Sequence, residues 1–514
     1  MLRVGRDFYL INSTFSWFPG IPVFHSRDLV HWRQIGNAID RPTQLDFSGL
    51  GMSRGIFAPA IAYHGGRFFI VTTCVDCGGN FVITATDPAG PWSDPVWLKD
   101  VDGIDPSLFF DDDGSAWIVN NRPPEGKPLY EGHRAIWVQR FDPVRLRTVG
   151  APKLVVNGGV DLAAKPVWIE GPHLFKQDGH YYLSAAEGGT SVNHSQVIFR
   201  AERVDGPYMP APPSVNPILT QRDLNPARLH PVTSAGHADL VRLADGRWWA
   251  VFLATRPYAD DLYNTGRETY LLPVTWRDGW PVVLAKGQPI PGFVPRPLAS
   301  ASVARPTTGS FTVRDEFDGG ALDRRWMVMR TPKVRWWRLA GGSLWLEARD
   351  VGFGTGGQPS MVARRQQHAD ATVTTSLVFS PAEGAAAGVA LVQNDDFFLA
   401  SGLTRERGET RVALWRRAGA DQPAQGVKLA SIPVAWKPDQ PVRLRVHARG
   451  GRCDFDFAIG KGAWRPLAHA VDATNLSTAK AGGFVGTMIG PFARGGRSGS
   501  RARARTARVD RTPL

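Results

Sequence analysis

The chain has 514 residues, of which 43% are hydrophobic and 21% charged, and it carries a formal net charge of +13. Its length exceeds what one hydrophobic core serves, so we expect at least two domains, and its composition excludes a disordered, collagenous or fibrous protein. No run of about 18 apolar residues and no secretory leader is visible, so we expect no membrane partner and place the protein in the cytoplasm.

Hairpin signals recur along the first 300 residues. A turn followed by aromatic residues occurs five times, and the second aromatic position of each copy is Tyr9, Phe69, Trp117, Tyr182 and Trp249. Asp-Gly or Gly-Gly in the turn supplies the positive φ angles of a tight hairpin, and the aromatic residues suit a half-buried strand. The copies are 48 to 67 residues apart, which fits a four-stranded unit with loops. Five such units predict a five-bladed β-propeller over residues 1–300.

The cysteines carry little information. Three of them in a chain of this length cannot form a disulfide framework, and Cys74 and Cys77 are the only close pair. We interpret that pair as a chance occurrence in a strand, because no second pair and no histidine at ligand spacing completes a zinc or redox motif.

Ionisable residues recur at one position of the repeat. Twelve residues before three of the aromatic positions lie Asp105, Glu170 and His237, and Phe57 lies at the same position before Phe69. Equivalent positions in rotationally related blades lie on one ring, so we expect two carboxylates and an imidazole at a shared axial pocket. The alternative is that the acids cap turns and the histidine is a core residue. Three ionisable groups in one register favour the pocket.

Carboxylates across an aromatic channel suit the cleavage of a glycosidic bond, which needs a proton donor for the leaving oxygen. The donor must be protonated near neutral pH, so burial or a neighbouring negative charge has to raise its pKa. Glu170 has the longer side chain and is the better donor candidate, which leaves Asp105 to tune and orient it. Spacing alone does not assign these roles.

The motifs around these residues resemble a known family. Residues 3 to about 290 are similar to the bacterial β-xylosidases and α-L-arabinofuranosidases of glycoside hydrolase family 43, through segments 9–28, 85–92, 103–107, 170–173, 236–239 and 266–269. The resemblance implies a five-bladed propeller that hydrolyses xylose- or arabinose-capped glycosides with inversion of configuration. It implies that Glu170 is the general acid and Asp105 the acid that tunes its pKa. It also implies that His237 and Arg267 line the pocket, with His237 near the sugar ring or a bound ion.

One departure from the family pattern concerns the general base. Family members carry Pro-Asp-Pro-Ser about eleven residues before the first aromatic position, and that place falls just upstream of Met1. We therefore expect an incomplete first blade. Two interpretations stay open: the start is assigned too late, or the chain is a truncated enzyme of impaired activity. Loss of a general base costs about 10²- to 10⁴-fold in rate.

A second departure concerns the sugar-binding wall. Phe57 stands where the family usually shows tryptophan, and phenylalanine offers less stacking surface, so substrate preference is expected to differ. Phe15 and Trp17 in the first-blade loop are further stacking candidates. Their alternative role is packing within the blade.

The second half of the chain has a different sequence pattern. After a proline-rich connector from 281 to 308, alternating strands at 343–348, 371–379, 389–392 and 442–447 predict a β-sandwich of the jelly-roll, concanavalin-like type over residues 310–493. The resemblance implies an accessory domain from which a loop helps to close the pocket. At its start, Asp315-Glu-Phe-Asp318 is a candidate structural calcium site, with a solvated turn as the alternative.

Much of the basic character lies at the end of the chain. From Arg494 to Arg511 there are seven arginines and one aspartate, without an interleaved aromatic residue. We therefore predict a basic, disordered tail over residues 494–514 that is not a nucleic-acid arm, and a sandwich that lacks its final strand.

Together these observations predict an all-β glycosidase that acts on xylo- or arabinoxylo-oligosaccharides and requires no cofactor. The competing hypothesis is a propeller that binds carbohydrate without cleaving it. The sequence leaves open xylose against arabinose specificity and the oligomeric state.

Overall fold

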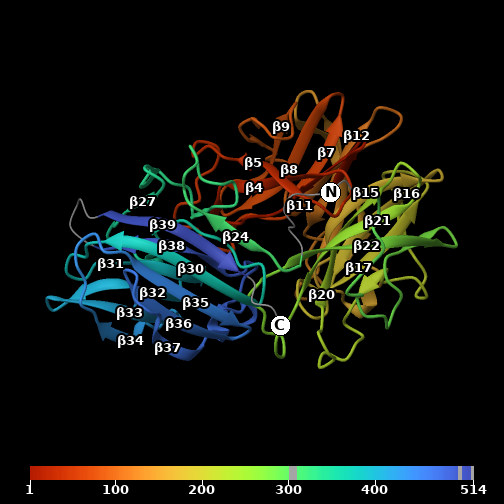
Figure 1. Cartoon of the computed structure of the whole chain (residues 1–514). Helices are drawn as coiled ribbons and strands as arrows, with labels where there is room; N and C mark the ends of the chain where they lie inside the picture. The colour runs from red at the N-terminus through yellow and green to blue at the C-terminus, as the bar shows by residue number, and fades with distance from the viewer. Residues whose placement is uncertain (300–308, 496–500, 511–514) are drawn as a thin grey trace.

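The structure is a computed structural model that describes residues 1–299, 309–495 and 501–510 (Figure 1). Within these residues nearly all regular structure is strand. The helical pieces are short: η1 (Leu162–Ala164), η2 (Phe353–Thr355), η3 (Thr474–Leu476) and α1 (Thr478–Ala481). None of the described helices is long and apolar enough to span a bilayer.

The first part of the chain forms five separate antiparallel sheets. The first holds β1 (Leu2–Val4), β2 (Asp7–Ile11), β4 (Gly20–Ser26) and β5 (Arg33–Ile39). The second holds β6 (Gly55–Ile56), β7 (Ala60–His64), β8 (Arg67–Val75), β9 (Gly79–Ala85) and β10 (Val96–Trp97). The third holds β11 (Ile104–Phe110), β12 (Ala116–Arg122), β13 (Ala135–Asp142) and β14 (Arg147–Asn157). The fourth holds β15 (Glu170–Gln177), β16 (His180–Glu187), β17 (Ser195–Ala201), β18 (Met209–Pro210) and β19 (Leu219–Thr220). The fifth holds β20 (Thr233–Arg242), β21 (Trp248–Thr255), β22 (Glu268–Arg277) and β23 (Trp280–Val282).

All five predicted hairpins are confirmed, as β1–β2, β7–β8, β11–β12, β15–β16 and β20–β21. Their leading strands contact one another in a closed ring that runs from β1 through β7, β11, β15 and β20 back to β1. Residues near the start of β11, β15 and β20 are thereby brought to one axis. Strand β1 is shorter than these three strands.

Cys74 and Cys77 form a disulfide bridge at the end of β8. The third cysteine, Cys453, is a buried free thiol. The interpretation of the close pair as a chance occurrence is therefore wrong, because the turn after β8 brings the two Cα atoms to 5.2 Å, which is within disulfide range.

The second part of the chain is a sandwich of two large sheets. One holds β24 (Thr312–Asp315), β26 (Trp337–Leu339), β27 (Leu344–Glu347), β30 (Asp370–Phe379), β35 (Val442–Arg449), β36 (Arg452–Ile459), β37 (Arg465–Asp472) and β39 (Arg501–Asp510). The other holds β28 (Ser360–Met361), β29 (Arg364–Arg365), β31 (Ala386–Asn394), β32 (Phe397–Glu406), β33 (Glu409–Ala418), β34 (Val427–Pro433) and β38 (Met488–Arg494). The predicted strands are present, and in β35 buried and partly exposed residues alternate, as expected for a sheet with one face on the core.

The prediction of a disordered tail is wrong for residues 501–510, which form β39. This strand lies between β27 and β30, so the sandwich has an inner strand where we expected none. The physical reason is backbone pairing on both sides: residues 501–504 pair with β27 and residues 502–510 with β30, and Ala502, which pairs with Leu346 and Phe379, is buried. The rest of the expected tail beyond residue 495 lies outside the described residues.

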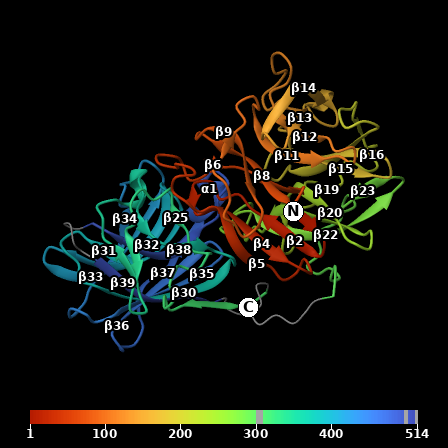
Figure 2. The same cartoon turned by 90° about the horizontal axis from the view of Figure 1, so that it is seen from above.

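The two parts of the chain lie side by side in both views (Figures 1 and 2). A two-stranded sheet joins β3 (Trp17–Phe18) in the first part to β25 (Val328–Met329), which follows the connector. Around α1, Ser477 accepts a hydrogen bond from the amide of Tyr263 at 2.9 Å, and the amide of Thr478 donates to the Tyr263 carbonyl at 3.2 Å. The second domain therefore fixes the loop that precedes β22.

Candidate active site

The predicted acids and the histidine do lie together, at irregularities in the leading strands. The ladders shift register between Ile104 and Ser107 in β11, between Glu170 and His173 in β15, and between Gly236 and Asp239 in β20. Such bulges bend a strand and redirect its side chains. The same local distortion in three sheets is what turns these residues toward one another.

The register of one of these strands, β15, differs by one residue from the sequence expectation. The residues inside the bulges that share a left-handed backbone are Asp105 (φ 54°), Gly171 (φ 56°) and His237 (φ 54°). Glu170 is one position earlier, at the paired residue before the bulge. Counting back twelve residues from the aromatic position of this hairpin therefore reaches Glu170 and not the equivalent residue, Gly171. The reason is that the turn of the β15–β16 hairpin is one residue shorter than those of β11–β12 and β20–β21.

Asp105 links the three strands. Its Oδ2 accepts a hydrogen bond from the amide of Gly171 at 3.2 Å and lies 3.4 Å from Nε2 of His237. The imidazole of His237 covers Gly171 so closely that a Cβ there would stand 2.4 Å from its Cε1. Glycine is therefore required at 171 both for its φ angle and for the space that His237 fills.

Glu170 has the properties of a proton donor. It is 9% exposed, and burial together with the nearby charge of Asp105 raises the pKa of its carboxyl to about 7, although His237, Arg267 and Arg134 act in the opposite direction. At neutral pH a large fraction of Glu170 is therefore protonated, as a general acid must be.

The cationic groups at this site are also buried. Burial lowers the pKa of His237, but its hydrogen bond to Asp105 and the charges of Asp105 and Glu170 outweigh that effect, so its pKa is raised. Burial lowers the pKa of the Arg267 guanidinium, and the charges of Glu170, Tyr263 and Asp105 oppose it. The two acidic and the two basic side chains of the site therefore interact electrostatically with one another.

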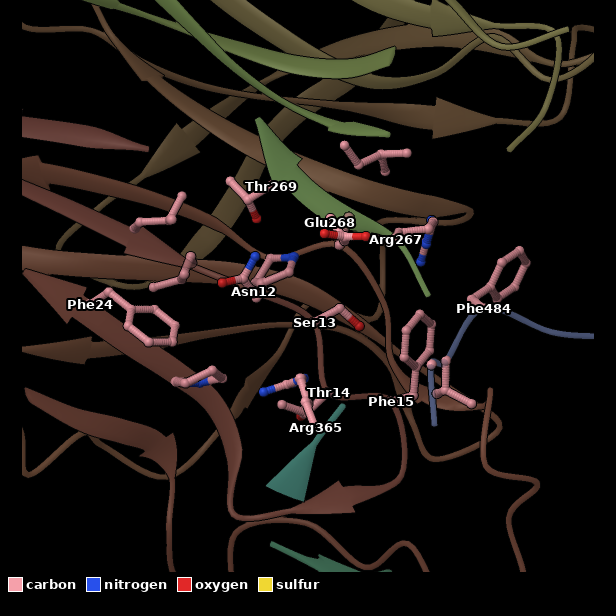
Figure 3. A pocket seen from close by; sticks show the side chains of 18 of the residues that line it. Asn12, Ser13, Thr14, Phe15, Phe24, Arg267, Glu268, Thr269, Arg365 and Phe484 are labelled. Atoms are coloured by element: carbon pink, nitrogen blue, oxygen red, sulfur yellow. The ribbon is translucent and has the colours of Figure 1, made fainter. Parts of the chain in front are cut away.

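Three phenylalanines form one wall of the cavity. Phe15 and Phe57 lie 5.6 Å apart, and each lies 5.8 Å from Phe484, between ring centroids. The guanidinium carbon of Arg267 is 5.6 Å from the Phe15 ring and 5.0 Å from the Phe484 ring, an arrangement visible in Figure 3. Phe484 belongs to the loop between α1 and β38 of the second domain, and its amide donates to Ser53 Oγ at 2.8 Å.

Trp17 has a different environment from the other aromatic candidates. It is 3% exposed and packs in an apolar cluster with Met327, Met329 and other residues of the second domain. Although it borders the cavity, its main contacts tie the two domains together.

Sequence reasoning missed Arg134 and Phe484. Arg134 precedes β13, donates from Nε to Asn121 Oδ1 at 2.7 Å and lines the cavity beside the acids. Burial lowers the pKa of its guanidinium, and the charges of Asp102, Asp105 and Glu170 oppose that effect. Neither residue stands at the repeated position, so no spacing signal could have found them.

The cavity is wide, with a volume of about 1910 Å³, and both domains line it. Among the described residues no group of three or more histidine, cysteine, aspartate or glutamate side chains is arranged to hold a metal ion. At the candidate calcium segment, the Asp315 carboxylate accepts from the amide of Phe317 at 2.8 Å and from Trp326 Nε1 at 2.7 Å, while Glu316 pairs with Arg314.

Comparison with known proteins gives consistent matches over the whole chain. Residues 1–281 match the family model of glycosyl hydrolases family 43, and residues 314–510 match that of the β-xylosidase C-terminal concanavalin A-like domain. The chain is 36% identical to a xylosidase/arabinosidase of Butyrivibrio fibrisolvens, over 96% of this chain and 92% of that protein. It is also 36% identical to a non-reducing end α-L-arabinofuranosidase of Bacteroides ovatus, over 96% and 88%. The solved structure of a xylan β-1,4-xylosidase from Bacillus halodurans C-125 superposes with a TM-score of 0.86 at 30% identity, covering 99% of this chain and 97% of that one.

Proposed function

Since this chain belongs to glycosyl hydrolases family 43, as its motifs predicted, we propose that it removes terminal xylose or arabinofuranose from xylan-derived oligosaccharides by an inverting acid/base mechanism. It is a glycosidase with a concanavalin-like second domain. In this proposal the five sheets are the blades of a five-bladed propeller, and the closed ring of leading strands supports that arrangement.

The observation that carries the proposal is the environment of Glu170. A buried carboxyl with a pKa of about 7, beside a second acid and under an aromatic wall, suits proton donation to a departing sugar oxygen. In the reaction Glu170 gives its proton to the glycosidic oxygen as the bond to the anomeric carbon breaks. A water molecule attacks that carbon from the opposite face and loses a proton to a base. Asp105 keeps Glu170 protonated and holds His237 in place.

The base is the open part of this mechanism. Among the other carboxylates that line the described cavity, Glu268 is paired with Arg256 and Asp323 with Arg325, and Asp239 lies 3.8 Å from Nδ1 of His173. Ion pairing stabilises a carboxylate and weakens it as a base. We propose, as the family resemblance implies, that the base is the aspartate of a Pro-Asp-Pro-Ser segment, a motif that the 514 residues do not contain.

The test of the function is hydrolysis of nitrophenyl β-xyloside and nitrophenyl α-L-arabinofuranoside by the chain with and without an added Pro-Asp-Pro-Ser extension. We expect activity on at least one of them and an increase of about 10²-fold or more with the extension. A matched extension with Asn in place of Asp is the control. Sugar binding without hydrolysis by either form would favour the non-catalytic alternative.

Replacing the acid gives a prediction specific to its role. Glu170→Ala should abolish cleavage of xylobiose, whose leaving group needs a proton, while lowering the rate on nitrophenyl glycosides by about 10-fold or less, because nitrophenolate leaves unprotonated. Steady-state kinetics on both substrates measure this difference. Equal losses on the two substrates would contradict the assignment of Glu170.

A further inference from the structure

Trp168 is an unusual residue at the mouth of the cavity. Among the described residues that line the cavity it is the most exposed aromatic, at 39%, and it stands two positions before Glu170. Its backbone is left-handed, with φ at 53°. A bulky residue in that conformation stores strain of about 1–3 kcal/mol, which persists only where the surroundings fix it.

The surroundings of Trp168 do fix it. Its amide donates to the Gly132 carbonyl at 2.9 Å, and the Gly188 amide donates to the carbonyl of the preceding residue, Val167, at 2.9 Å. Gly132 packs beside this segment, since a Cβ there would stand 3.0 Å from Val167 Cγ1 and in ordinary contact with the indole, 3.5 Å from Trp168 Cδ1. The backbone before Glu170 is therefore held from two neighbouring segments.

One face of the indole is occupied by Arg134. The guanidinium carbon of Arg134 lies 5.2 Å from the indole ring, and the hydrogen bond from its Nε to Asn121 Oδ1 holds the guanidinium in place. An exposed aromatic ring stacked on a fixed cation presents its remaining surface to the cavity as a flat, rigid apolar platform.

The position of this platform relative to the acid defines what it can bind. Glu170 delivers its proton to the oxygen between the terminal sugar and the leaving group, so the leaving group lies on the Glu170 side of the cavity, toward the solvent. Phe15 in the aromatic wall is buried, whereas Trp168 is exposed and stands two residues before Glu170. Trp168 is therefore placed to contact the leaving-group sugar and not the terminal sugar that cleavage releases.

We propose that Trp168 is the stacking platform for the leaving-group sugar, a xylopyranose unit of the oligosaccharide, and that it sets the preference for oligosaccharide substrates. This inference rests on the proposed function. The strained backbone holds the ring ready for stacking, so the substrate bears no ordering cost for it.

The test compares the activity of Trp168→Ala with that of the wild type on xylotriose and on trifluoroethyl β-xyloside, whose leaving group is too small to stack. If the wild type prefers arabinofuranose, the two substrates are arabinofuranosyl xylotriose and trifluoroethyl arabinofuranoside. We expect kcat/KM to fall about 10-fold or more on the oligosaccharide and less than about 2-fold on the trifluoroethyl glycoside. Trp168→Phe should recover most of the loss. The control is Trp464→Ala, which removes an indole stacked 4.4 Å from Arg445 in the second domain, outside the cavity.

A binding measurement separates this inference from the proposed function. If the wild type hydrolyses nothing, the proposed function fails, and calorimetric titration of the Glu170→Gln variant with xylose and xylotriose decides the inference. Adding Trp168→Ala should then weaken xylotriose binding about 10-fold and leave xylose binding unchanged. An unchanged affinity or kcat/KM for the oligosaccharide, or equal losses on the small and the large ligand, would overturn the role of Trp168.

Discussion

The negative charge of Asp105 raises the pKa of the Glu170 carboxyl. Since burial and the charge of Asp105 both raise the pKa of Glu170, Asp105→Asn removes one of the two causes while keeping the side-chain shape. Glu170 must be protonated to act, so activity is lost as pH rises through its pKa. The alkaline limb of kcat/KM, expected near pH 7 in the wild type, should therefore move to lower pH by about one unit in the variant. A pH profile on xylobiose measures it, and an unmoved limb would contradict the tuning role.

The residues of the site were predictable to different degrees. Asp105 and His237 could be found because the hairpin turns repeat and both residues stand twelve positions before an aromatic residue, whereas the same count reached Glu170 one position before the equivalent residue, Gly171. Phe484 could not, because it reaches the cavity from a loop of the other domain more than 300 residues away from Glu170. Contacts between distant segments leave no periodic trace in one sequence.

At the scale of elements, the bulge at the start of β15 makes a prediction about Gly171. Gly171→Ala forces a left-handed alanine and pushes a methyl group into the imidazole of His237, so we expect kcat/KM to fall about 10²-fold as His237 moves off Asp105. Gly179→Ala is the matched control: it has φ of 81° in the β15–β16 turn and open space around it, so it carries the backbone strain of about 1–2 kcal/mol alone. Similar activity losses in both variants would show that strain, and not displacement of His237, is the cause.

Strand β39 shows why some elements escaped sequence reasoning. Alternating alanine and arginine gives weak apolar periodicity, because a methyl group adds little hydrophobic area and arginine dominates the composition. What stabilises the strand is backbone pairing on both sides, with β27 and β30. The sandwich strands with valine and leucine, such as β35, were predicted because one face buries large side chains.

At the scale of the whole molecule, the second domain is part of the active site. It contributes Phe484 to the aromatic wall and holds the loop before Arg267 through Ser477 and Thr478. A glycine pair at this contact, Gly266 and Gly486, lets the two backbones approach so closely that a Cβ on Gly266 would stand 2.7 Å from Gly486 Cα. The geometry of the pocket therefore depends on how firmly the domains are joined.

Arg330 is the residue that tests this coupling. Its guanidinium is 3% exposed and donates to the Leu50 carbonyl of the first domain at 2.8 Å, to the Gly357 carbonyl at 2.6 Å and to both Asp395 oxygens at 3.0 and 2.7 Å. Arg330→Met leaves two carbonyls and a carboxylate without this partner, and we expect the free energy of unfolding to fall by about 3 kcal/mol. Urea unfolding followed by tryptophan fluorescence measures this change.

The same variant should also lower kcat/KM, because a loosened interface moves Phe484 away from Phe15 and Arg267. Arg203→Met is the matched control, since it removes an exposed arginine paired with Asp205 far from the interface and should leave stability and activity nearly unchanged. If Arg330→Met lowered stability but left kcat/KM on the oligosaccharide intact, the pocket would keep its geometry without a firm domain contact. In that case the second domain would contribute to activity only through the Phe484 side chain. The double variant Arg330→Met, Phe484→Ala would then lose activity, although Arg330→Met alone does not.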